Sequence, residues 1–141
     1  MEASVRVALR SDPLDPGALV AEVRRSDSGA TALFLGTARD YSDGKTGVTH
    51  LEYEAYAEHV EPKLRKICEE AAHRWPVLAL VVEHRVGEVD VGEASVAVAV
   101  STAHRGDAFE AARFVIDELK RRAPIWKREH WPGGAEWVEG A

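Results

Sequence analysis

Two apolar segments in the second half of the chain constrain its fold most strongly. The segments are VLALVVEHRVG (77–87) and EASVAVAVSTA (93–103), and a short turn region containing Gly87 and Gly92 joins them. Short apolar runs that are rich in β-branched residues and bounded by glycine are typical of buried β-strands. We therefore expect two strands of a sheet here.

Three other segments have the pattern of helices. Asp15 followed by Pro16 is a helix N-cap with proline at the first helical position, so a helix is expected to begin there. Residues 57–75 and 106–123 carry apolar side chains at helical spacing. Pro124 is expected to end the last helix, because the residue before a proline disfavours helical backbone angles.

The remaining strands define the fold class. Strands are expected at 4–10, 30–38 and 48–56, and as two short strands around a turn in the tail, 125–139. The strand at 30–38 is apolar enough to be central in its sheet. The order β-α-β-β-α-β-β-α-β-β predicts an α+β fold with a mixed or antiparallel sheet covered by helices. Residues 1–141 are expected to form a single domain with a flexible loop at about 40–47.

Composition narrows the class of protein. The chain has 141 residues and a net charge of −6, and 45% of its residues are hydrophobic, as in one soluble globular domain. The acidic balance argues against a nucleic-acid partner. The start of the chain lacks the pattern of a secretory signal, and no apolar run has membrane-spanning length. We expect a cytoplasmic protein with no membrane partner, and we expect its only cysteine, Cys68, to be a core residue.

The basic residues of this acidic chain gather in LKRRAPIWKREHW (119–131). Helical phase separates them, because Lys120 lies about 20° outside the apolar face whereas Arg121 and Arg122 point to solvent. Lys120 fits two interpretations. Its stem lies on the core with the ammonium in water, or its pKa is lowered by partial burial and nearby cations, so that it exchanges protons near neutral pH.

Four further side chains are candidates for an anion-binding site. Lys127 lies in a tail segment without a clean apolar alternation, so it belongs either to an edge strand guarded by charge or to a pocket beside Lys120. His104 and Arg105 lie between an apolar strand and a helix start, which is a favourable place for an anion. Arg39 follows another apolar strand. His104 also fits an ordinary loop histidine, and Arg39 also fits a solvated loop charge.

Common catalytic and metal-binding motifs are absent. The chain has no GxxxxGK[ST], HExxH or CxxC sequence, and its six histidines show no convincing metal-ligand spacing. We therefore expect no metal site, and any chemistry must come from lysine and arginine.

Three separated segments resemble the large, catalytic subunit of molybdopterin synthase. LEYEAYAEHVEPKL (51–64), VEHRVGEVDVGEASVAVAVSTAHRGDAFEA (82–111) and IDELKRRAPIWKRE (116–129) agree with that family in order and spacing. FLGTARD (34–40) resembles its arginine-bearing loop, and the resemblance extends over residues 31–137. It implies an α/β hammerhead-type fold with additional short antiparallel strands.

The resemblance also implies a function. Such a subunit is a sulfurtransferase that moves sulfur from the C-terminal thiocarboxylate of a small ubiquitin-like partner, ending in Gly-Gly, to cyclic pyranopterin monophosphate. The product is the dithiolene of molybdopterin, and no cofactor is needed. The subunit forms a homodimer within a heterotetramer.

By motif, the resemblance makes Lys120 and Lys127 the catalytic pair and makes Arg39, His104 and Arg105 the substrate-binding residues. Without the resemblance, the residues fit equally a non-catalytic module that binds an anionic metabolite or a ubiquitin-like tail.

Overall fold

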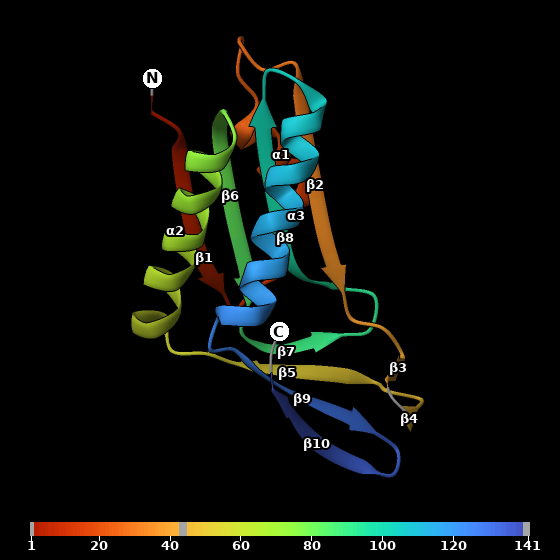
Figure 1. Cartoon of the computed structure of the whole chain (residues 1–141). Helices are drawn as coiled ribbons and strands as arrows, with labels where there is room; N and C mark the ends of the chain where they lie inside the picture. Colours follow the sequence, from red (N-terminus) through yellow and green to blue (C-terminus); the bar gives the residue numbers. More distant parts are fainter. Residues whose placement is uncertain (1, 43–44, 140–141) are drawn as a thin grey trace.

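The computed structural model describes residues 2–42 and 45–139, which form three helices and ten strands (Figure 1). In chain order they are β1 (Ser4–Arg10), α1 (Pro16–Val23), β2 (Ala30–Thr37), β3 (Tyr41–Ser42), β4 (Lys45–Thr46), β5 (His50–Glu54), α2 (Ala57–Arg74), β6 (Val77–Arg85), β7 (Gly87–Asp90), β8 (Ala94–Thr102), α3 (Arg105–Arg122), β9 (Trp126–Trp131) and β10 (Gly134–Glu139). No helix among these described residues is long and apolar enough to cross a membrane.

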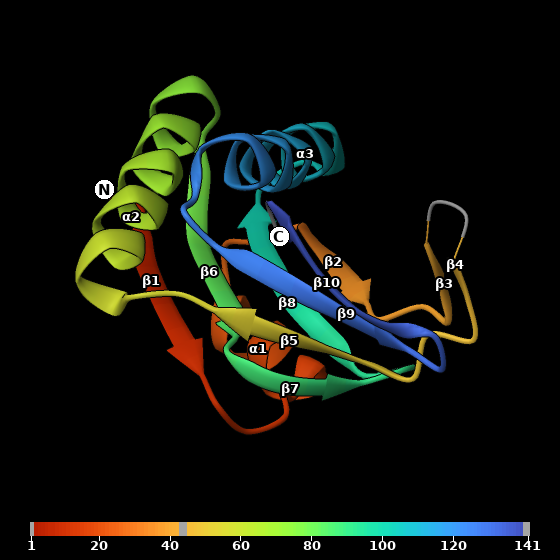
Figure 2. The ribbon, with the colours of Figure 1, turned by 90° about the horizontal axis from the view of Figure 1, so that it is seen from below.

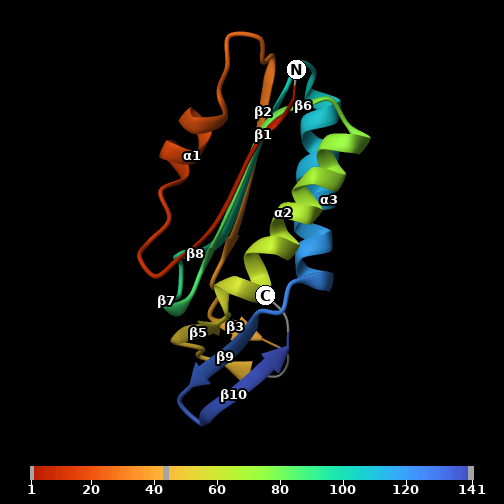
Figure 3. The ribbon, with the colours of Figure 1, turned by 90° about the vertical axis from the view of Figure 1, so that its left-hand side faces the viewer.

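The larger sheet has the strand order β1-β6-β8-β2. β1 pairs with β6 in parallel, and the other two pairings are antiparallel. Figure 3 shows α2 and α3 on one face of this sheet and α1 on the other. The main core lies under α2 and α3, and a smaller cluster around Leu19 and Val23 lies under α1. The predicted α+β class, with a mixed sheet covered by helices, is confirmed.

The two central strands are buried along almost their whole length. Because helices cover both faces of the sheet, most side chains in both alternate sets on β6 and β8 are apolar or small. The exceptions on β6 are Glu83, His84 and Arg85, which are buried at its end. This explains the two apolar segments from which the fold class was predicted.

The prediction that strand 30–38 is central is wrong, because β2 lies at an edge of the sheet. α1 and α3 contact opposite faces of β2, so its side chains are mostly apolar, although among the described residues one of its backbone edges has no partner strand. The apolar composition of a strand indicates that its two faces contact other elements. It does not indicate whether the strand is central or at an edge of the sheet. At this edge the helices cover the strand less completely than they cover the central strands, and Leu33 is 37% exposed.

A second sheet, of order β10-β9-β5-β7, lies across one end of the first (Figures 1 and 2). All of its pairings are antiparallel. Leu51, Tyr53 and Val89 pack from this sheet into the main core. β9 has a neighbour on each side, so the interpretation of the tail as a charged edge strand is wrong. β7 occupies part of the expected turn region between β6 and β8.

Two local predictions concern the start of α1 and the loop at 40–47. The N-cap of α1 is confirmed, because the backbone N–H of Ala18 donates to the Asp15 carboxylate at 3.1 Å. Within the expected loop 40–47, Tyr41–Ser42 pairs with Lys45–Thr46 as a short hairpin, while residues 43–44 lie outside the described residues. The flexibility of this segment stays a prediction.

Candidate active site

A cleft of about 250 Å³ opens where the end of α3 meets the two sheets. Its lining includes three cationic side chains from separate parts of the chain, Arg39, Lys120 and Lys127. A glutamate, Glu129, and a tyrosine, Tyr53, also line it. The fold therefore brings together three of the five site residues expected from the sequence.

The end of α3 sets the positions of both lysines. Lys120 belongs to the last helical turn, and the helix stops at Ala123, whose N–H donates to the Leu119 carbonyl at 2.9 Å. Pro124 then prevents the helix from continuing. Ile125 is 1% exposed, and its side chain packs into the core at this bend. The chain enters β9 from this bend, and Lys127 returns to the cleft that Lys120 lines.

Arg39 is positioned by the end of β2. The register between β2 and β8 shifts at Gly36 and Thr37, beside the cleft. A Cβ atom on Gly36 would lie 2.7 Å from Cγ1 of Val96, so the close approach of the strands at this irregularity requires glycine. Arg39 follows three residues after Gly36, with its guanidinium 4.8 Å from the centroid of the Tyr41 ring.

The pKa of Lys120 lies below the ordinary value for lysine. Although its side chain is exposed in the single chain, the surrounding protein removes enough water from the ammonium to lower the pKa. The positive charges of Lys127 and Arg39 lower it further. Partial desolvation and nearby cations are the two conditions that the proton-transfer interpretation of Lys120 requires.

Replacing Lys127 with methionine is expected to raise the pKa of Lys120 towards its ordinary value, because one of the two nearby positive charges disappears. The measurement is an NMR titration of the Lys120 side chain, which does not depend on turnover. Arg128→Met is the matched control, since Arg128 lies on the other face of β9, 5.7 Å from the Trp137 ring. Equal Lys120 titrations in the wild type and in Lys127→Met would contradict this electrostatic coupling.

Glu129 was missed by sequence reasoning. Its side chain is almost fully buried and accepts a hydrogen bond from Lys45 at 3.1 Å. Burial raises the pKa of this carboxyl, but hydrogen bonds from Ser42 and Lys45, with the charges of Lys45 and Lys127, lower it below the ordinary value overall. Glu129 is therefore an anionic counter-charge in the cleft. Its position two residues after Lys127, on the same face of a strand, is the signal that points to it.

His104 and Arg105 do not reach this cleft within one chain. His104 is the residue before α3 and Arg105 is its first residue, whereas Lys120 is in its last turn (Figure 1). At 1.5 Å per residue, the helix separates Arg105 from Lys120 by about 22 Å. Both residues are exposed at the far end of the main sheet.

The cysteine has the structural position expected of it. Cys68 is fully buried in α2, and burial raises the pKa of its thiol to about 12. A thiol that stays protonated at neutral pH is a poor nucleophile.

Comparisons with known proteins agree with one another on the family. The family model described as MoaE protein matches residues 9–122. A molybdopterin synthase catalytic subunit from Halalkalibacterium halodurans is 38% identical over 135 residues, which cover 96% of this chain and 86% of the relative. Molybdopterin synthase catalytic subunit 1 from Aedes aegypti is 45% identical over 135 residues, covering 93% and 86%.

Solved structures agree with this result. The crystal structure of molybdopterin synthase from Staphylococcus aureus has a TM-score of 0.87 and 32% identity, covering 92% of this chain and 94% of that one. Molybdopterin cofactor biosynthesis protein E from Burkholderia multivorans has a TM-score of 0.80 and 41% identity, covering 99% and 90%. This chain therefore belongs to the MoaE family, together with the molybdopterin synthase catalytic subunits that it resembles.

Proposed function

We propose that this chain is the catalytic subunit of a molybdopterin synthase and acts as a sulfurtransferase. It takes sulfur from the C-terminal thiocarboxylate of a small ubiquitin-like partner that ends in Gly-Gly. Two such sulfur atoms, one from each of two thiocarboxylate tails, are delivered to cyclic pyranopterin monophosphate and so form the dithiolene of molybdopterin. The observation that carries the proposal is the cleft in which Arg39, Lys120 and Lys127 meet.

The charge distribution suits these reactants. Both the thiocarboxylate and the phosphorylated pterin are anions, so they repel each other in solution. Three cations concentrated in one cleft of a protein whose net charge is −6 attract both anions and offset that repulsion.

Each cation has a separate role in this proposal. Lys120, with its lowered pKa, takes and gives protons as sulfur adds to the pterin and oxygen leaves. Lys127 holds the carbonyl oxygen of the donor tail or the negative charge that develops on it. Arg39 grips the phosphate, because a guanidinium donates two parallel hydrogen bonds to phosphate oxygens.

The small partner and the oligomer belong to the same proposal. A solved complex of subunits 1 and 2 of molybdopterin-converting factor from Helicobacter pylori shares the fold, with a TM-score of 0.77 and 22% identity. We propose an equivalent two-subunit assembly here, with a homodimer inside a heterotetramer. His104 and Arg105, about 22 Å from Lys120 along their own helix, then contribute to the cleft of the second copy. The cytoplasmic location stays a prediction from the sequence.

Reconstitution tests the function directly. The purified chain is mixed with thiocarboxylated partner and cyclic pyranopterin monophosphate, and the dithiolene product is measured. We expect product to form only when all three components are present. Binding of both components without product would favour instead a non-catalytic module for an anionic metabolite or a ubiquitin-like tail.

Replacing Arg39 with alanine is expected to weaken binding of the phosphorylated substrate by about 10- to 100-fold, because hydrogen bonds to charged groups contribute about 1.5–3 kcal/mol. Arg39→Lys should recover part of the loss, since lysine keeps the charge but not the two-pronged contact. Calorimetric titration with substrate measures both effects. An unchanged affinity in Arg39→Ala would remove Arg39 from the phosphate site.

A further inference from the structure

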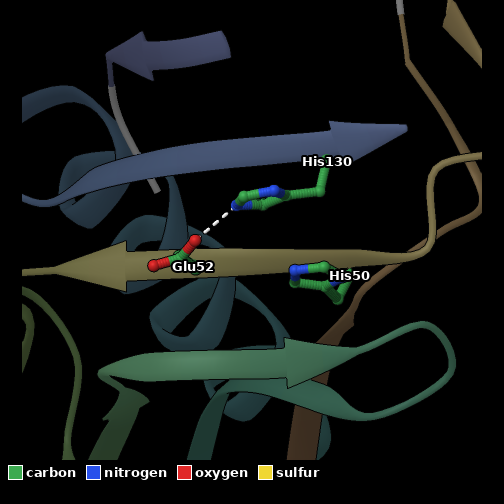
Figure 4. Close-up of side chains that lie close together, drawn as sticks. All are labelled: His50, Glu52 and His130. Atoms are coloured by element: carbon green, nitrogen blue, oxygen red, sulfur yellow. Dashed lines mark hydrogen bonds and ion pairs between the residues drawn. The ribbon is translucent and has the colours of Figure 1, made fainter. Parts of the chain in front are cut away.

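Three side chains with metal-binding atoms converge on the outer face of the second sheet. His50 and Glu52 come from β5 and His130 comes from β9 (Figure 4). Their donor atoms all lie within 4.8 Å of one another. In this part of the sheet, Leu51 and Tyr53 face the core, so the alternating residues of β5 face outwards.

The register of the sheet creates this group. His50 lies directly opposite His130 in the β5–β9 pairing, and their rings stack with centroids 4.2 Å apart and an angle of 14° between their planes. Glu52, the next outward residue of β5, forms a hydrogen bond with Nε2 of His130. Figure 4 shows the His130 ring reaching towards Glu52 above the His50 ring.

The surroundings of the group are acidic. On the neighbouring strand β7, Asp90 lies opposite His50 and Glu88 lies opposite Glu52, and both are exposed. The one cation paired directly opposite a member of the group is Arg128, opposite Glu52, and its guanidinium lies over the Trp137 ring. Carboxylates around two imidazoles favour binding of a cation over binding of an anion.

We propose that His50, Glu52 and His130 bind one Zn²⁺ ion. Two imidazole nitrogens and one carboxylate oxygen are a donor set that zinc uses when a fourth position is left for water, and imidazole disfavours Mg²⁺ and Ca²⁺. Tetrahedral ligands with bonds of about 2.0–2.1 Å lie about 3.3 Å apart. The three side chains are only half-buried, so they can rotate to bring their donors to that separation. The ion then takes the place of the hydrogen bond between His130 and Glu52.

This site is separate from the proposed catalytic cleft. Side chains on β9 alternate, so Lys127 and Glu129 face the cleft while His130 faces the opposite side of the sheet. The zinc site therefore does not depend on the proposed function. It does revise the expectation from the sequence, in which the six histidines showed no metal-ligand spacing.

The test is zinc binding to the full chain after chelator treatment and dialysis. Zn²⁺ is titrated against a chromogenic zinc chelator, and we expect one tightly bound ion per chain. His50→Gln, Glu52→Gln and His130→Gln should each weaken binding about tenfold or more, which is at least the loss seen when only a supporting partner of a ligand is removed. His59→Gln is the matched control, because His59 is an exposed histidine on α2. It should bind zinc like the wild type.

A second readout on the wild type avoids any doubt about variant folding. NMR spectra of the imidazole nitrogens should show zinc-dependent changes at His50 and His130 and none at His59. Zinc should also raise the melting temperature of the wild type, because a ligand that binds only the folded state stabilises it. Absence of stoichiometric binding would overturn the proposal, as would imidazole changes confined to other histidines. Equal binding by His50→Gln and the wild type would do the same.

Discussion

Replacing Lys120 with alanine is expected to reduce sulfur transfer by about 100- to 10,000-fold, the range that a positioned general acid–base group contributes. The fold should survive, because Lys120 is exposed in the last turn of α3 and alanine is the residue most favourable to helices. Binding of the small partner should persist as well. The measurement is dithiolene formation in the reconstituted system, with partner binding measured separately.

Two other variants distinguish a role of Lys120 in proton transfer from a role of its positive charge alone. Arg121→Ala removes the adjacent cation, whose side chain is 72% exposed and pairs with Glu118 at 2.8 Å on the surface. We expect wild-type turnover from it, since exposed ion pairs contribute little. Lys120→Arg keeps a positive charge but cannot lose its proton near neutral pH, so it should remain inactive. Wild-type-like turnover in Lys120→Ala would refute the assignment.

Replacing Ile125 with alanine is expected to lower the free energy of unfolding by about 2–5 kcal/mol, the usual cost of deleting a large buried aliphatic side chain. Ile125 is 1% exposed and belongs to the main core, at the bend between α3 and β9. Neighbouring helices and strands cannot fully close the resulting cavity. Urea denaturation followed by circular dichroism measures the change.

The matched control for this substitution is Ile125→Val, which removes one methylene and should cost only about 0.5–1.5 kcal/mol. A graded series from isoleucine to valine to alanine would show that packing at the bend stabilises the protein. Equal stability of all three chains would show that the bend is held by other contacts.

Several features were predictable from the sequence because they depend on local chemistry. The phase of helix 106–123 places Lys120 at the border of the apolar face. Pro124 ends that helix whatever the rest of the chain does. The two long apolar segments become β6 and β8 because a strand covered on both faces must be apolar on both.

Other features depend on which segments pair, and local patterns do not carry that information. β2 is apolar yet lies at an edge. β3, β4 and β7 are short strands that are defined by backbone pairing with a neighbouring strand. His50 and His130 lie far apart in the chain and meet only through the register of β5 and β9.

Two findings about the expected site residues were predictable with a further step of reasoning. Glu129 shares a face with Lys127 by simple alternation along a strand, and was missed because a charged residue in that set looked like solvent-facing surface. The separation of Arg105 from Lys120 also follows from the sequence, because a helix of 18 residues is a rigid spacer.

The assembly of the cleft from two sheets affects how the protein can lose activity. Lys120 belongs to a helix packed on the first sheet, whereas Lys127 belongs to the second sheet. Proteins open in cooperative units whose opening free energies are smaller than that of global unfolding. Undocking of the second sheet would separate the two lysines even if α3 and the first sheet stayed folded. The proposed active site therefore persists only while the two sheets remain docked, and we expect activity to be lost no later than the fold itself.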